Sequence, residues 1–127
     1  MATITEDYVS FETAKLLKEK GFDGECRDYY NTDGHFYSED FKSNWNHGGS
    51  ATITIFSAPT LQMAMKWLRE VHDCPIEILW HWDADSQCSE WYFAHHMELK
   101  SLPQIQYYDT YEAACEAAIK YCLENLI

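Results

Sequence analysis

The sequence predicts one α+β domain covering residues 1–127, with three helices packed on a mostly antiparallel sheet. Three segments repeat apolar residues at helical spacing and carry residues typical of helix ends. The segments between them alternate β-branched or aromatic residues with polar ones, as strands do. The expected order is a helix, one or two strands, a helix, a two-stranded hairpin and a last helix. With 46% hydrophobic residues, a chain of 127 residues can form a packed core.

The first helix is expected over residues 11–20. Ser10 is of a residue type that caps helix N-termini by accepting a hydrogen bond from a free backbone N–H. Gly21 follows the helix, where a left-handed residue is favoured. Phe22 then occupies the position that contacts Leu17 in a Schellman C-cap. These residues predict both ends of the helix.

The stretch between the first two helices has a weaker pattern. The residues "ECRDYY" (25–30) predict a short strand that ends at the turn "NTDG". Residues 31–50 mix aromatic residues with turn formers, so we expect an irregular loop there. Such a loop is either a lid over the core or a binding surface. The residues "ATITIF" (51–56) alternate β-branched side chains and predict the clearest strand of this half.

The second helix is expected over residues 59–72. Ser57 is its predicted N-cap, and Pro59 is tolerated in the first turn, where a missing N–H costs nothing. Its apolar positions recur at helical spacing and predict a buried stripe, made of Leu61, Met63, Ala64, Met65, Trp67, Leu68 and either Val71 or His72.

The third helix is expected over residues 110–125. Asp109 and Glu112 have the spacing of a capping box. Glu116 and Lys120 are expected to form an exposed ion pair one turn apart. The predicted buried stripe of this helix consists of Tyr111, Ala114, Cys115, Ala118, Ile119, Cys122 and Leu126.

A hairpin is expected from strands at 76–83 and 90–99, because both segments alternate apolar and polar residues. Two registers keep apolar residues opposite one another, with either Trp80 or Trp82 facing Trp91, and both give the same assignment of faces. The predicted apolar face carries Ile76, Ile78, Trp80 and Trp82 of the first strand and Trp91, Phe93, His95, Met97 and Leu99 of the second.

The polar residues of this hairpin do not predict a metal site. His81 and His96 would lie about 10–13 Å apart, too far to bind one zinc ion. Asp83, Asp85 and Glu90 match no EF-hand spacing. The chain also lacks the GxSxG, P-loop, GxGxxG and HExxH motifs, so we expect no catalytic residues and no cofactor.

Acidic residues dominate the charge of the chain. It has 21 Asp and Glu against 9 Lys and Arg, a formal net charge of −12. Such a surface repels phosphate groups, so direct binding to nucleic acid is not expected. The excess charge either keeps the protein soluble or attracts a basic partner.

The five cysteines include no CxxC pair and are odd in number, which predicts reduced thiols in a reducing compartment. The first residues lack the basic and apolar parts of a secretion signal. The apolar runs are much shorter than the ~20 residues that span a bilayer. We therefore expect a soluble cytoplasmic protein.

A binding surface is predicted where aromatic residues combine with a polar rim. It would join the 31–50 loop to the hairpin tip, through His35, Tyr37, Trp45, Asp83 and Asp85. The alternative is a small-molecule binding module with an aromatic pocket between the loop and the hairpin. Five tryptophans and nine tyrosines also predict a homodimer, through the hairpin or the last helix.

Three blocks, "YVSFETAKLLKEKGFD", "SAPTLQMAMKWLREVH" and "YEAACEAAIKYCLENLI", resemble a family of small uncharacterised proteins of phages, prophages and mobile elements of gut bacteria. The resemblance implies an accessory protein in the bacterial host, and it supplies no catalytic residues. We therefore expect a non-enzymatic protein that binds a host protein or a defence factor, and consider an enzyme the least favoured class.

Overall fold

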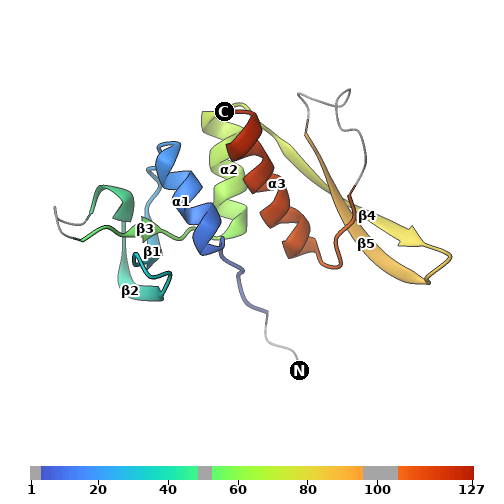
Figure 1. Cartoon of the computed structure of the whole chain (residues 1–127), viewed down its shortest axis with the longest axis horizontal. Helices are drawn as coiled ribbons and strands as arrows, with labels where there is room; N and C mark the ends of the chain where they lie inside the picture. Colours follow the sequence, from blue (N-terminus) through green and yellow to red (C-terminus); the bar gives the residue numbers. More distant parts are fainter. Residues whose placement is uncertain (1–3, 49–52, 96–105) are drawn as a thin grey trace.

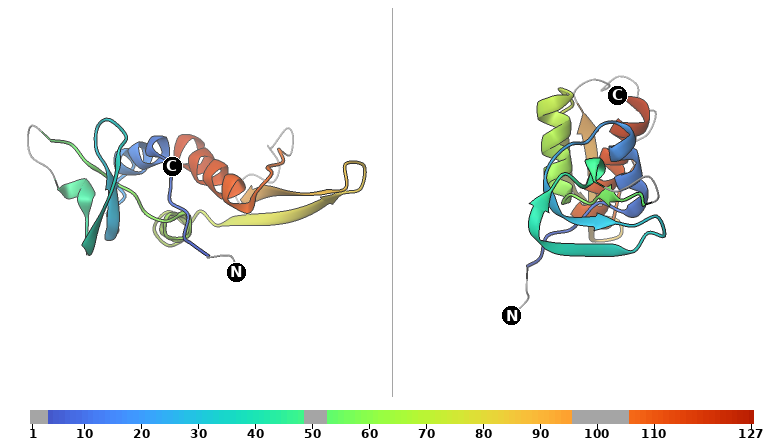
Figure 2. Two further views of the ribbon diagram at one scale, coloured as in Figure 1. Left: turned by 90° about the horizontal axis from the view of Figure 1, so that it is seen from below. Right: turned by 90° about the vertical axis from the view of Figure 1, so that its left-hand side faces the viewer.

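The computed structural model describes residues 4–48, 53–95 and 106–127. Three helices form the centre of the molecule: α1 (Phe11–Glu19), α2 (Leu61–Val71) and α3 (Tyr111–Asn125). Two antiparallel sheets lie at opposite ends of this helical centre (Figures 1 and 2). The predicted α+β class is confirmed, but the described strands divide into two sheets instead of forming one.

Both predicted ends of α1 are confirmed. The Ser10 hydroxyl accepts a hydrogen bond from the backbone N–H of Thr13 at 3.2 Å. At the other end Gly21 has a φ of +91°, which a glycine adopts without strain. The Phe22 N–H donates to the Leu17 carbonyl at 2.9 Å, which is the Schellman hydrogen bond.

The N-caps of α2 and α3 differ from the prediction. Thr60 caps α2 by accepting from the Met63 N–H at 3.1 Å, and Thr110 caps α3 in the same way. The predicted caps, Ser57 and Asp109, lie too far upstream. Ser57 belongs to a strand and its hydroxyl accepts a hydrogen bond from Asn46 at 3.1 Å. A capping residue must directly precede the first helical turn, and the threonines hold that position.

The core lies between the facing sides of the three helices. Most of the predicted stripe residues of α2 and α3 are buried there, but Met63 is 41% and Val71 60% exposed, and His72 and Tyr111 are only half-buried. Cys74 and Cys122 bring their sulfur atoms within 3.3 Å of each other. The cluster consists of Val9, Ala14, Leu17, Phe22, Leu61, Ala64, Met65, Trp67, Leu68, Cys74, Cys115, Ile119, Cys122 and Leu123.

The first sheet has the order β2-β1-β3, with β1 at Cys26–Tyr30, β2 at Phe36–Ser43 and β3 at Phe56–Ser57. The strand predicted from "ECRDYY" is confirmed. The irregular loop predicted over residues 31–50 is wrong, because Phe36–Ser43 forms a strand that pairs antiparallel with β1. This strand was not predicted because its segment contains residues that are common in turns and loops, namely Ser38, Asp40 and Ser43. An irregularity in the pairing accommodates extra residues of β2 between Ser38 and Ser43.

The strand predicted at 51–56 is also largely wrong. Residues 51 and 52 lie outside the described residues, and of the rest only Phe56 belongs to β3. The carbonyl of Ile55 accepts a hydrogen bond from the Lys18 side chain at 2.8 Å. Alternating β-branched residues favour a strand only where a neighbouring strand can pair with them.

The hairpin is confirmed, with β4 at Ile76–Asp83 and β5 at Cys88–His95. Its register places Trp80 opposite Trp91, one of the two predicted registers. The second strand begins two residues earlier than predicted, and residues 96–99 lie outside the described residues. The far half of the hairpin extends beyond α3 (Figure 1), so Trp80 and Trp82 remain 57% and 51% exposed.

In the described part of the chain, none of the helices combines the length and apolar character needed to cross a bilayer.

Candidate functional site

The structure separates the residues that the sequence grouped into one binding surface. Tyr37 belongs to β2, His35 directly precedes that strand and Trp45 begins the 3₁₀ turn after it, whereas Asp83 and Asp85 lie at the hairpin tip. These two regions are at opposite ends of the molecule (Figure 1). The prediction that they form one continuous surface, or enclose one aromatic pocket, is therefore wrong.

Three aromatic residues cover the outer face of the first sheet. Tyr37 stacks on Tyr29 with ring centroids 5.6 Å apart, and Trp45 contacts Tyr29 at 4.6 Å. The Trp45 indole N–H donates to the Cys26 carbonyl at 2.7 Å. Tyr37 is 44% exposed, while Trp45 is half-buried. Trp45 thus covers the sheet, whereas Tyr37 and the exposed His35 are accessible from solvent.

The hairpin tip gathers groups that could bind a metal ion. Asp83, Cys88 and Glu90 bring ligand atoms within 4.8 Å of one another among the described residues. The sequence predicted no metal site here from Asp83, Asp85 and Glu90; the structure brings Cys88 close to Asp83 and Glu90, because Asp83 faces Cys88 in the observed register. Asp83 already accepts hydrogen bonds from Ser86 at 2.7 Å and from the Asp85 N–H at 3.1 Å. The Ser86 bond, followed by the Asp85 N–H, lowers the pKa of the Asp83 carboxyl. This carboxylate therefore stabilises the turn.

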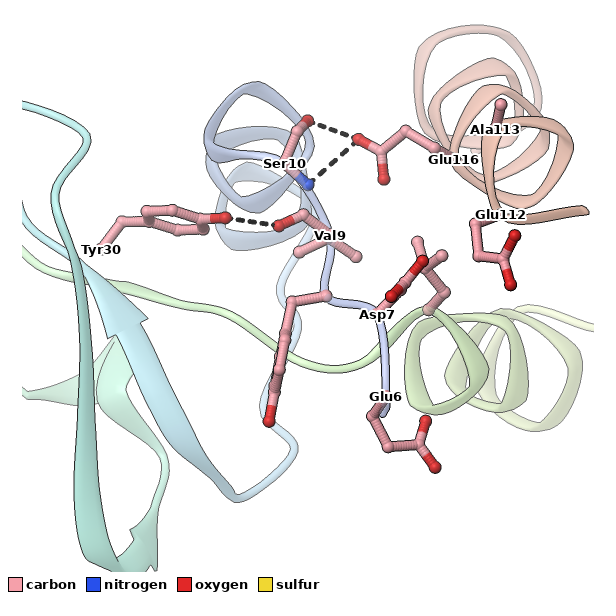
Figure 3. A pocket seen from close by; sticks show the side chains of 10 residues that line it. Glu6, Asp7, Val9, Ser10, Tyr30, Glu112, Ala113 and Glu116 are labelled. Atoms are coloured by element: carbon pink, nitrogen blue, oxygen red, sulfur yellow. Dashed lines mark hydrogen bonds between the residues drawn. The ribbon is translucent and has the colours of Figure 1, made fainter. Parts of the chain in front are cut away.

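A pocket of about 460 Å³ opens between the N-terminal segment and α3. It is lined by Glu6, Asp7, Tyr8, Val9, Ser10, Tyr30, Leu61, Glu112, Ala113 and Glu116. Figure 3 shows the carboxylates of Asp7, Glu112 and Glu116 grouped around the space between the segment and the helix, with Glu6 further out. We call this the acidic pocket.

The N-terminal wall of the acidic pocket is fixed by backbone hydrogen bonds. The Val9 N–H donates to the Pro59 carbonyl at 3.1 Å, and the Leu61 N–H donates to the Asp7 carbonyl at 2.9 Å. The Tyr30 hydroxyl donates to the Val9 carbonyl at 2.7 Å. The segment is thus held between α2 and the first sheet, and the Asp7 side chain is presented beside α3.

Glu116 is the most constrained carboxylate of the acidic pocket. Its Oε1 accepts hydrogen bonds from the Thr13 hydroxyl at 2.6 Å, from the Ser10 N–H at 3.1 Å and from the Ser10 hydroxyl. A negative charge at the N-terminus of α1 is also favoured by the helix dipole. Glu116 does not form the predicted ion pair with Lys120, which instead pairs with Glu12 at 3.0 Å and Glu124 at 3.9 Å.

The second oxygen of Glu116 is left without a partner. Within residues 4–48, 53–95 and 106–127, Oε2 is buried and makes no hydrogen bond. Among the described residues, the lining of the pocket contains four carboxylates and no Lys, Arg or His. Burial raises the pKa of the Tyr30 hydroxyl, and the charge of Glu116 raises it further. The acidic pocket thus offers a negative, partly desolvated site that suits a cation.

Little in the sequence indicates the acidic pocket. Its carboxylates come from residues 6–7 and 112–116, and no local spacing relates the two ends of the chain. The usable signal was the position of Glu116 on the buried side of α3, between Cys115 and Ile119. A charged residue beside a core stripe needs a partner, but the local sequence does not show which distant segment supplies it.

Comparison with protein-family models, with curated proteins and with solved structures gave no match.

Proposed function

We propose that this chain is a non-enzymatic interaction protein whose acidic pocket receives a cationic side chain of a partner protein. The observation that carries the proposal is the buried Oε2 of Glu116, which lacks a hydrogen-bond donor within the described residues and faces a pocket with three further carboxylates. A buried acceptor without a donor costs about 1–3 kcal/mol. A donor supplied by a partner would recover that cost when the Glu116 side chain turns to expose this oxygen to the pocket.

An arginine side chain fits the chemistry of the acidic pocket better than a lysine. Its planar guanidinium has five N–H donors and can bond several carboxylate oxygens at once. Tyr8 lines the pocket and is 39% exposed, so it offers an aromatic ring to the same cation. Tyr8 also contacts Phe36 at 5.1 Å, which extends an apolar rim onto the first sheet.

The partner that we propose is a host protein or a defence factor of a bacterium, as the resemblance to phage and mobile-element proteins implies. The formal charge of −12 supports a basic partner, because opposite charge speeds association. The same charge disfavours nucleic acid as a direct ligand. His35 and Tyr37 are accessible on the first sheet and would contact the partner outside the pocket.

The test begins with small probes of known chemistry. N-acetyl-arginine amide, its lysine analogue and its glutamine analogue are titrated into the protein and followed by NMR. We expect shifts of the backbone amides around Asp7, Tyr8 and Glu112 with the arginine probe, weaker ones with lysine and none with glutamine. Equal shifts with all three probes, or shifts confined to other regions, would contradict the proposal.

A second test uses charge-matched variants in a pull-down from host lysate. Asp7→Asn with Glu112→Gln removes two pocket charges, and Glu19→Gln with Glu70→Gln removes two exposed charges elsewhere. We expect the pocket variant to lose the captured protein and the control variant to keep it. Equal loss would show a general charge effect, in which case the pocket is not the binding site.

The second candidate function is the binding of a small cationic molecule. The volume of the acidic pocket, about 460 Å³, favours it, although the aromatic pocket first expected does not form. Native mass spectrometry of the purified protein separates the two functions. A retained small mass that disappears in the Asp7→Asn, Glu112→Gln variant would favour the small molecule over a partner protein.

A further inference from the structure

The outer edge of β4 carries unpaired backbone groups. Trp91 and Tyr108 exchange two backbone hydrogen bonds, at 2.8 and 2.7 Å, so the N–H and C=O of Trp91 point away from β4. Trp80 lies opposite Trp91, and in an antiparallel ladder both residues of such a pair point their backbone groups outward. The groups of Trp80 therefore lie at the free edge of the hairpin.

The same direction of the backbone groups recurs at every second residue along β4. Alternate residues of a strand direct their backbone groups to the same edge. Ile76, Ile78 and Trp82 therefore also present their N–H and C=O at the free edge. No strand pairs with this edge in the part of the chain that the structure describes. A strand of eight residues is thus available for pairing with another strand.

We propose that two copies of this chain form a dimer by antiparallel pairing of their β4 strands across a two-fold axis. The pairing would join the two hairpins into one four-stranded sheet, a mode of association that β-edges commonly use. This inference goes beyond the proposed function and does not depend on the acidic pocket, which lies at another place on the molecule.

The charges of β4 select one register. Antiparallel hydrogen bonding allows only registers that place residues with outward-facing backbone groups opposite one another, so the two-fold axis must pass through a residue position. An axis at Trp80 would place Glu77 opposite Asp83 of the other copy, twice, and like charges in that position destabilise a sheet. An axis at Leu79 instead places Glu77 opposite His81 in both halves, a pair of complementary polar groups.

The register centred on Leu79 also pairs apolar residues throughout. Ile78 lies opposite Trp80 of the other copy, and Ile76 lies opposite Trp82. These are the hydrogen-bonded pairs, because their backbone groups face outward. The two exposed tryptophans would each gain an isoleucine neighbour, and aromatic–β-branched pairs are favourable across strands. Axes at Ile78 or His81 give shorter ladders, because Pro75 or the hairpin turn interrupts them.

The first measurement is the mass of the chain in solution by light scattering over a range of concentrations. We expect twice the mass of one chain at high concentration. Added salt should increase the dimer fraction, since each copy carries a formal charge of −12. A monomer at all concentrations in high salt would overturn the proposal.

Disulfide trapping then tests the register. In a Cys88→Ser background, which removes the exposed cysteine, Leu79→Cys places two thiols opposite each other on the axis. Opposed residues in such a non-hydrogen-bonded pair have Cα atoms about 4.5 Å apart, within the range for a disulfide. We expect rapid formation of a covalent dimer under mild oxidation with copper phenanthroline.

Matched single-cysteine variants provide the controls. Glu77→Cys should not cross-link to itself, because the two copies of that residue would lie about 13 Å apart. It should cross-link to His81→Cys when the two proteins are mixed. A dimer in which Trp80→Cys cross-links and Leu79→Cys does not would overturn this register. A dimer in which none of these pairs cross-links would overturn the β4 interface. Far-ultraviolet circular dichroism of each variant checks that it is folded.

Discussion

The two strand pairs of this protein, β1–β2 and β4–β5, are both rich in aromatic residues but differ in what covers them. In β1–β2, Tyr30 packs against Phe11 of α1 at 5.5 Å and donates a hydrogen bond to the Val9 carbonyl. In β4–β5, only the half near the core meets a helix, where Trp91 contacts Tyr111 at 5.4 Å. Trp80, which lies opposite Trp91, and Trp82, two residues nearer the tip, are more than half exposed.

This difference shows that the apolar face of a strand and the burial of that face are separate properties. Alternation assigned Trp82 to the same face as Ile76 and Ile78, and the register confirms it. Ile76 and Ile78 pack against the core cluster, whereas Trp82, near the hairpin tip, is 51% exposed. The position of the helix decides which residues of the apolar face are covered.

The largest expected effect on stability is a difference between a residue of β1–β2 and a residue of β4–β5. Tyr30→Ala should lower the free energy of unfolding by about 3 kcal/mol, since it removes a half-buried ring that contacts two others. Trp82→Ala should cost less than about 1 kcal/mol. Urea unfolding at a concentration where the chain is monomeric measures both. An equal cost for the two variants would contradict the comparison.

A smaller effect is expected on the outer face of β1–β2. Trp45→Phe removes the hydrogen bond to the Cys26 carbonyl and should cost about 1–2 kcal/mol. Tyr37→Ala, on the same face, should leave the melting temperature nearly unchanged and instead weaken the capture of a partner. If Tyr37→Ala lowers the melting temperature as much as Trp45→Phe, Tyr37 stabilises the sheet and is not part of a binding surface.

The cysteines distinguish the helical centre from the hairpin tip. Burial raises the pKa of the Cys115 thiol to about 11, from an ordinary value of 9.0. The unfolded chain therefore loses this proton at lower pH than the folded chain. The contribution of the buried Cys115 thiol to the free energy of unfolding is fully present below about pH 9. It declines as the pH rises toward about 11, with a loss of about 1 kcal/mol at pH 10.

Urea unfolding at several pH values measures how the free energy of unfolding depends on pH. The control variant Cys115→Ala should weaken this dependence between pH 9 and 11. Alkylation with iodoacetamide at neutral pH should modify the exposed Cys88 first and Cys115 last. Fast modification of Cys115 in the folded protein would show that the helical centre opens more readily than the hairpin.

The smallest expected effect concerns the hairpin turn. Gln87 has a φ of +54°, a conformation that favours glycine. Gln87→Gly should stabilise the fold by less than about 1 kcal/mol. The matched variant Asp73→Gly, at a φ of +52° after α2, should give a similar gain. A gain from Asp73→Gly alone would indicate that the hairpin tip unfolds separately from the helical centre.

The sequence by itself determined the features that depend on neighbouring residues along the chain. Ser10 and Gly21 fixed the ends of α1, because caps act within one turn. The alternation of residues 76–83 fixed the faces of β4 and left two registers, since a shift by two residues preserves each face. The α+β class followed from the order of these elements.

Only the tertiary structure decided the features that join distant parts of the chain. It divided the strands into two sheets, paired β2 with β1 despite turn-forming residues, and left Trp80 and Trp82 more than half exposed. It also brought Glu116 to Ser10 and Thr13, which formed the acidic pocket. Local sequence patterns cannot predict these long-range contacts. A carboxylate or a strand edge bonds to the group that lies beside it, and the packing of the core decides which group that is.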